Sequence, residues 1–171
     1  GLYFFGPILQ DIIMAYFLCL ETSGDICSVC VTNDLEILAE LQSPKDFSHT
    51  QHITIYIEEC LKMASMALKD INCVVISGGP GSYTGLRVAA SVAKALCFSL
   101  EIPLISIDSL TALAHSTRYI KEGSFIVPLI DARNSNAYTA VFDAERNKLK
   151  EISFEKLNEA FMKDFDAEFI F

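Results

Sequence analysis

A glycine-rich segment has the residue types best suited to chemistry. Residues 77–87 read Ser-Gly-Gly-Pro-Gly-Ser-Tyr-Thr-Gly-Leu-Arg, between a short apolar run and a helical pattern. Glycines let backbone approach a ligand closely, and the N-terminus of the helix beyond them offers free N–H groups and a positive dipole end. The segment therefore suits a bound anion, but it equally suits a tight turn that packs the helix on a sheet. The residues that would form an anion-binding loop are Gly78, Gly79, Gly81, Ser82, Thr84, Gly85 and Arg87.

Two well-known phosphate-binding patterns are absent from this segment. No Gly-Lys-Ser/Thr follows the glycines, as a P-loop requires, and the dinucleotide-binding glycine pattern is also missing. Pro80 removes one backbone donor. The segment therefore predicts neither a P-loop enzyme nor a dinucleotide-binding site.

Two acidic residues, Glu21 and Asp131, each follow an apolar run that we predict to be a first strand. Actin-like ATPases hold metal and nucleotide with carboxylates in such turns, next to glycines that leave room for phosphate. Gly24 follows Glu21, but no glycine follows Asp131, and Arg133 occupies that turn. We expect one half of a nucleotide site to be missing. Glu21 would then be a solvated turn residue, and Asp131 would pair with Arg133 or with a partner.

Histidine and cysteine spacings give weaker signals. His49 and His52 could reach one metal ion, but the Glu of a His-Glu-x-x-His metalloprotease helix is missing. Cys27 and Cys30 have CxxC spacing, but residues three apart in a strand point to opposite faces, and no second CxxC completes a zinc site. We expect surface or capping roles for the histidines and structural roles for the thiols. The sequence predicts no metal site and no catalytic residues.

Composition limits the functional class. Of 171 residues, 51% are apolar and 20% charged, as in globular proteins, and 22 acidic against 13 basic residues give a net charge of −9. No Lys/Arg cluster is present, so we expect no nucleic-acid binding by the chain alone. Six cysteines, most of them in apolar runs, suit free thiols in a reducing compartment. We expect a cytoplasmic protein.

The first 13 residues stand apart from the rest. The apolar stretch that they begin lacks the positive flank of a signal peptide, and Gly6-Pro7 and Asp11 interrupt it. We predict no membrane span. We interpret residues 1–13 as a tag or non-native leader, with Met14 as the natural start.

The elements that must position these residues follow an α/β order. The order resembles the ribonuclease-H-like core of the actin/hexokinase/Hsp70 superfamily, a mixed sheet with helices; this fold assignment is an analogy. A second set of strand patterns predicts two tandem copies, the second incomplete, with a first actin-like domain over residues 14–120 and the start of another over 121–171. The predicted elements are strands over 15–20, 26–31, 35–41, 73–76, 103–107, 124–131, 137–143 and 151–154, and helices from Ser48, over 84–100 and over 109–116.

The two longest predicted helices carry more apolar surface than one sheet needs. The first has a second apolar line, and the helix after the glycines has small residues that permit close approach of another helix. These faces suit an interface with a second copy or with a partner, whereas burial within the chain explains the same pattern equally well. The residues assigned to the partner interface are Ile55, Met63, Met66, Leu86, Ala90, Ala93 and Cys97.

Four stretches in order resemble the bacterial tRNA threonylcarbamoyladenosine biosynthesis protein TsaB (YeaZ) family, which is related to the glycoprotease/TsaD proteins. The resemblance spans Met14 to about Phe142, and Glu21 stands where the family usually has Asp. The four stretches are 17–23 with 27–29, 48–51, 79–87, and 130–133 with Tyr138 shortly after.

The resemblance implies a non-catalytic scaffold that pairs with the catalytic subunit TsaD through the two helices of the first domain. With the ATPase TsaE, such a complex transfers a threonylcarbamoyl group to an adenosine of tRNA. The chain would have no cofactor of its own, although a nucleotide at the partner interface is compatible, and it would meet tRNA only indirectly. A homodimer is a further expectation. Two alternative functions are an actin-like ATPase or sugar kinase, from the glycines and Glu21, and a glycoprotease-type metallopeptidase, from His49 and His52.

Overall fold

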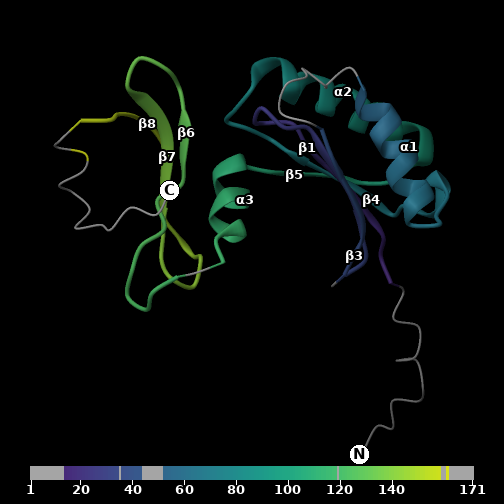
Figure 1. The fold of residues 1–171 in the computed structure, drawn as a ribbon, viewed down its shortest axis with the longest axis horizontal. Coiled ribbons are helices and arrows are strands. Elements are labelled where there is room, and N and C mark those ends of the chain that lie inside the picture. The colour runs from purple at the N-terminus through teal and green to yellow at the C-terminus, as the bar shows by residue number, and fades with distance from the viewer. Residues whose placement is uncertain (1–13, 35, 44–51, 119, 159–160, 162–171) are drawn as a thin grey trace, which may run out of the picture.

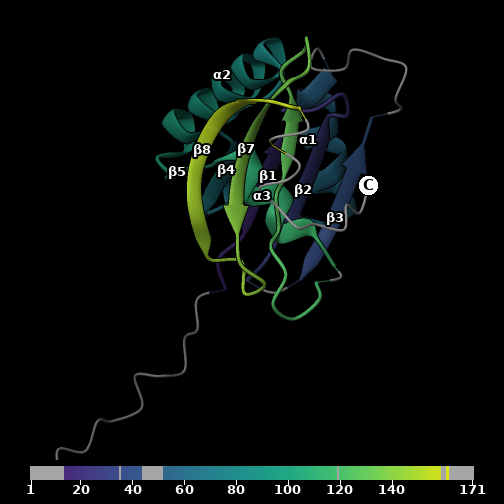
Figure 2. The same ribbon diagram turned by 90° about the vertical axis from the view of Figure 1, so that its left-hand side faces the viewer.

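The computed structural model describes residues 14–34, 36–43, 52–118, 120–158 and 161. These residues form a five-stranded mixed sheet with two helices on one face, a third helix, and a separate three-stranded sheet (Figures 1 and 2). The mixed α/β architecture expected from the sequence is confirmed. No helix in the described part of the chain is long and apolar enough to span a membrane.

The five-stranded sheet has the strand order β3-β2-β1-β4-β5. The first three strands are antiparallel neighbours, whereas β4 runs parallel to both β1 and β5. Helices α1 (Ile53–Met63) and α2 (Tyr83–Leu100) connect β3 to β4 and β4 to β5. Such crossovers allow parallel pairing, so the sheet is mixed. The strands are β1 (Phe17–Glu21), β2 (Ser28–Thr32), β3 (Ile37–Gln42), β4 (Cys73–Ser77) and β5 (Leu104–Ile107).

Helices α1 and α2 cover one face of this sheet (Figure 1). The strand residues that point toward them are buried, and alternate residues are more exposed, as the two-residue period of a strand requires. A 3₁₀ turn, η2 (Leu68–Asp70), leads into β4. The fully buried side chains of this first core include Leu18, Leu20, Val29, Val31, Ile53, Cys60, Val74, Ala89 and Ala93.

The opposite face of the sheet carries two half-buried cysteines directly across from each other, Cys19 in β1 and Cys30 in β2. Burial is the main cause that raises the pKa of Cys19 to about 11 and that of Cys30 to about 12. Both thiols are therefore protonated at neutral pH. All six cysteines are free, and the described residues contain no group of three or more side chains that could hold a metal ion.

The second sheet is an antiparallel meander in the order β6-β7-β8. Helix α3 (Ser109–Ser116) packs Leu110 and Ala114 against Ala140 and Phe142 of this sheet to form a small second core. The meander resembles the first three strands of the larger sheet, but the tandem copy and the domain boundaries stay predictions. The strands are β6 (Leu129–Asp131), β7 (Asn136–Phe142) and β8 (Lys148–Lys156).

Candidate partner-binding site

The glycine-rich segment forms the connection between β4 and α2, and much of its hydrogen bonding is internal. Ser82 is the N-cap of α2, and its hydroxyl accepts the Gly85 N–H at 3.3 Å. The Ser82 N–H donates to the Ser23 carbonyl at 2.7 Å, and the Gly78 N–H donates to the Ile107 carbonyl at 2.7 Å. Donors that a bound anion would need are thus partly engaged by the chain itself.

Close packing explains three of the glycines. A Cβ on Gly85 would overlap the Thr22 carbonyl oxygen, and a Cβ on Gly81 would overlap the Ser23 carbonyl oxygen. A Cβ on Gly78 would overlap the hydroxyl of Ser106 in β5. The geometry therefore favours the packing alternative for these three positions, and anion binding by the loop stays a prediction.

The turn after β1 is the surface on which this loop rests. Thr22 is 2% exposed, and its hydroxyl donates to the Gly85 carbonyl at 2.9 Å. The Glu21 carboxylate accepts the Ser23 N–H at 2.6 Å and also the Ser77 hydroxyl at the end of β4. Glu21 therefore ends β1 and starts the turn, and its half-buried carboxylate is held by donors of the chain and is not the solvated group that we expected.

The turn after β6 has a similar start, and its next residues have exposed side chains. The Asp131 carboxylate accepts the Arg133 N–H at 2.8 Å, so the expected pairing of these two residues is made through the backbone. Arg133, Asn134 and Ser135 follow with φ of 67°, 52° and 58°, and all three side chains are exposed. The turns after β1 and β6 lie at the same end of their sheets, the upper end in Figures 1 and 2.

The residues predicted for a partner interface fall into two groups. On α1, Ile55 is 48% and Met63 58% exposed, so both are open to a partner. On α2, Leu86 and Ala90 are only half-exposed, and Ala90 packs against the first core. Of the residues predicted for the interface, those on α1 are thus more exposed than those on α2.

Two further residues of the predicted interface on α2 face inward. Ala93 is 0% exposed, so its assignment to a partner interface is wrong in this structure; it lies against the sheet. Cys97 is half-buried, and its thiol contacts the Pro103 carbonyl oxygen at 3.4 Å, which turns this flank of α2 toward the start of β5. The error arose because small residues on a helix permit close approach to a sheet as well as to another helix.

The outward side of α2 is a shallow groove that sequence reasoning missed as an interface. Arg87 lies over the Tyr83 ring, 5.2 Å from its centroid, and donates to the Tyr83 hydroxyl at 3.0 Å. Phe98, near the end of α2, is 88% exposed. The signal was in the sequence, because Arg87, Ser91 and Lys94 recur at helical spacing and Phe98 continues that line. The groove is lined by Tyr83, Thr84, Arg87, Val88, Ser91 and Val92.

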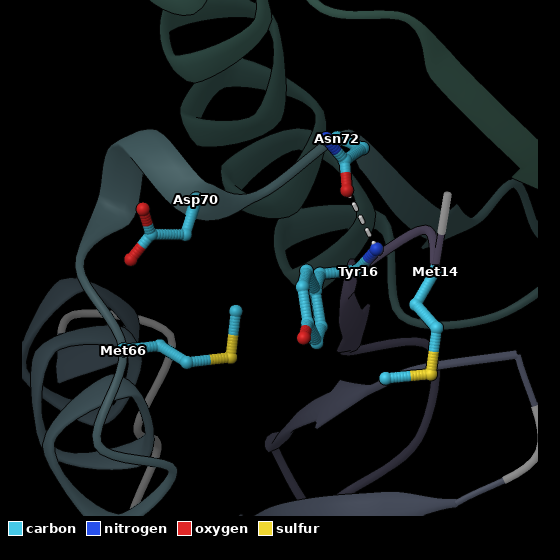
Figure 3. Close-up of a pocket in the computed structure, with 5 residues that line it drawn as sticks. All are labelled: Met14, Tyr16, Met66, Asp70 and Asn72. Atoms are coloured by element: carbon cyan, nitrogen blue, oxygen red, sulfur yellow. Dashed lines mark hydrogen bonds between the residues drawn. The ribbon is translucent and has the colours of Figure 1, made fainter. Parts of the chain in front are cut away.

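A second hollow, near the start of β1, holds Met66 (Figure 3). Met66 is half-buried there and faces Tyr16. The polar groups of the hollow have partners within the chain: the Asn72 side chain accepts the Tyr16 N–H at 2.7 Å, and Asp70 accepts the Ala67 N–H at 2.8 Å. These two hydrogen bonds hold the segment before β4 against the start of β1.

The histidine pair is only partly described. His52 is exposed at the N-cap position of α1, and its side chain makes no capping hydrogen bond. His49 and the predicted capping box from Ser48 lie outside the described residues. The sequence argument against a metallopeptidase, the missing Glu, is unaffected.

Comparison with known proteins identifies the relatives of this chain. Residues 43–165 match the model of the family TsaD: tRNA N6-adenosine threonylcarbamoyltransferase. The chain is 36% identical over 133 residues to the tRNA threonylcarbamoyladenosine biosynthesis protein TsaB of Buchnera aphidicola subsp. Acyrthosiphon pisum, covering 77% of this chain and 59% of the relative. It is 30% identical over 131 residues to TsaB of Escherichia coli, covering 76% and 56%. The chain therefore spans less than two thirds of the length of these curated relatives.

The fold agrees with these matches. The structure of YeaZ from Pseudomonas aeruginosa superimposes with a TM-score of 0.71 at 26% identity, covering 84% of this chain and 68% of that one. The superposition covers 84% of this chain, which is more than either sheet and its helices make up alone. The similarity therefore extends over both sheets.

Proposed function

The chain belongs to the TsaB/YeaZ branch of the TsaD family, and from this premise we propose that it is a non-catalytic subunit of the machinery that makes threonylcarbamoyladenosine in tRNA. The observation that carries the proposal is the pair of helices α1 and α2, whose outer surface presents large apolar side chains to solvent. Ile55, Met63, Tyr83 and Phe98 are between 48% and 88% exposed on these helices. Exposed aromatic and apolar anchors on neighbouring elements are typical of a protein-binding surface.

The state of the two acidic turns supports a scaffold over an enzyme. The Glu21 carboxylate is held by Ser77 and Ser23, and the glycine loop packs on the turn that would otherwise face phosphate. In the second turn, Arg133 follows Asp131 in place of a glycine. We therefore infer that catalysis resides in a partner.

The proposed partner is the catalytic subunit TsaD, which would bind the α1–α2 surface. Under this proposal the ATPase TsaE joins the complex, tRNA is met through the partner, and the protein works in the cytoplasm. The net charge of −9 supports this division of labour, because an acidic chain repels tRNA unless a basic partner holds it. A nucleotide, if one is needed, would lie at the partner interface.

Size-exclusion chromatography with light scattering tests the proposal, on this chain alone and mixed with TsaD of the same organism. We expect a heterodimer in the mixture. Phe98→Asp should weaken it by about 10- to 30-fold, because a central aromatic anchor contributes roughly 1.4–2 kcal/mol or more to such an interface.

Phe125→Asp is the matched control, because Phe125 is also a phenylalanine with an exposed ring, at 61%, but precedes the second sheet. It should leave the heterodimer unchanged. Absence of a complex with the unmodified chain would refute the proposal. Equal weakening by both variants would move the interface away from α2. A dimer of the chain alone that Phe98→Asp dissociates would show that a second copy competes for the same surface.

A further inference from the structure

The turn over residues 21–23 contacts the start of α2 through two hydrogen bonds and the end of β4 through a third. The Thr22 hydroxyl donates to the Gly85 carbonyl at 2.9 Å, and the Ser23 carbonyl accepts the Ser82 N–H at 2.7 Å. The Glu21 carboxylate ties the same turn to Ser77, where β4 ends. The start of α2 is therefore hydrogen-bonded to the turn after β1, and that turn is itself tied to the end of β4, the strand that precedes α2 in the chain.

We propose that this turn is a positioning element for partner binding, with Thr22 setting the direction in which the N-terminal end of α2 presents Tyr83 and Arg87. This inference rests on the proposed function. It assigns to the turn a role that differs from ligand binding: the acidic residue and the glycines hold a protein-binding helix in place.

The geometry gives the reason. Gly85 packs directly on the Thr22 carbonyl, and no residue with a Cβ fits there, so the distance between helix and turn is fixed by backbone contact. Tyr83 and Arg87 lie within one helical turn of Gly85 and are exposed. Phe98 is 13 residues further along α2, about 20 Å away at 1.5 Å per residue, and beyond direct influence of the turn.

Thr22→Val tests the proposal, because valine keeps the shape of threonine and removes the hydroxyl. We expect Thr22→Val to weaken TsaD binding by about 3- to 10-fold, and Thr22→Ser, which keeps a hydroxyl, to restore most of the affinity. A melting curve of each variant verifies that the chain is folded before binding is measured.

A double-mutant cycle separates positioning from general stability. Thr22→Val should be strongly non-additive with Tyr83→Ala, because a misplaced Tyr83 has little binding left to lose, and additive with Phe98→Ala. If Thr22 had only a structural role, the effect of Thr22→Val on binding would be additive with both Tyr83→Ala and Phe98→Ala, or coupled equally to both. Either result would overturn the positioning role.

Hydrogen exchange on the isolated chain gives an independent readout. The amides of Leu86 and Arg87, in the first turn of α2, should exchange faster in Thr22→Val, whereas those near Phe98 should not change. If the unmodified chain fails to bind TsaD, the proposed function falls whatever the exchange shows. If it binds but the cycle with Tyr83 is additive, only the positioning role falls.

Discussion

The turn after β1 and the turn after β6 begin alike and differ in what rests on them. In each, an acidic side chain accepts the backbone N–H two residues later, at 2.6 Å for Glu21 and 2.8 Å for Asp131. The next residue is Thr22 in the first turn, 2% exposed, and Ala132 in the second, half-exposed. Among the described residues, the glycine loop and the helix that follows it pack on the first turn and not on the second.

In both turns the carboxylate fixes the local backbone, and in the first it also accepts a hydroxyl from β4. Whether the turn gains a larger role depends on a neighbouring segment that fits it without a Cβ. In the first region that segment is the loop before α2, and contact with the Thr22 carbonyl requires Gly85. The second turn carries three exposed residues in the left-handed region, and the Leu157 N–H donates to its Ser135 carbonyl at 2.7 Å.

Gly85→Ala should break the first region with the largest effect. A Cβ at this position overlaps the Thr22 carbonyl oxygen, so the start of α2 must shift away from the turn. We expect a loss of about 2 kcal/mol in the free energy of unfolding, typical of overpacking, despite the better helix propensity of alanine. Urea denaturation measures it.

Gly24→Ala is the matched control, since Gly24 lies in the same turn and a Cβ added there would have no atom within 4 Å. Its effect should stay under about 0.5 kcal/mol. An equal loss in both variants would show that the helix does not depend on the close contact at Gly85.

Replacing each carboxylate by its amide sharpens the comparison at an intermediate magnitude. Glu21→Gln leaves one acceptor oxygen for two donors, Ser77 and Ser23, and should cost about 1–2 kcal/mol. Asp131→Asn keeps the single acceptor that Arg133 uses at an exposed site, and should cost less than about 0.5 kcal/mol. Thermal and urea unfolding compare the two. If Asp131→Asn lost more unfolding free energy than Glu21→Gln, the carboxylate of the second turn would be the more important of the two for stability, contrary to our prediction.

A smaller effect should appear where α3 meets the second sheet, away from both turns. Asp108, the N-cap of α3, accepts the Lys148 ammonium of β8 at 3.0 Å. Burial works to raise the pKa of Asp108, but hydrogen bonds from Thr111 and Lys148 and the charge of Lys148 outweigh it and hold the pKa below its usual value. The ionised form is thus favoured by folding.

The sign of the pH dependence follows from this lowered pKa. The stabilisation is complete above the unfolded-state pKa of about 3.9 and is lost as pH falls through the lower folded-state value. Between about pH 5 and pH 2, unfolding free energy should fall more steeply for the unmodified chain than for Asp108→Asn, by roughly 0.5–1 kcal/mol. Chemical denaturation at each pH measures it, and parallel curves for the two proteins would contradict the assignment.

Much of the fold could be predicted from local pattern. The first strands, α2 and the strand before it follow the two- and 3.6-residue periods of their apolar residues, which depend on the sequence alone. Boundaries were less accurate: the strand expected over 151–154 extends over Lys148–Lys156, because pairing with β7 continues past the apolar residues. The predicted strand over 124–131 contributes only Leu129–Asp131 to β6.

The sequence by itself determined the α/β class, the glycine-rich connection and the absence of a basic cluster, because each depends on residue type and short spacing. Only the tertiary structure decided which flank of α2 is open. The helix has small residues on several sides, and the sheet covers Ala93 while Tyr83 and Phe98 remain exposed. The tertiary structure also decided why Gly85 is a glycine, because Gly85 contacts Thr22, which is 63 positions away in the chain. Local pattern specifies what a segment can form, whereas the position of its neighbours decides which of its faces is left for function.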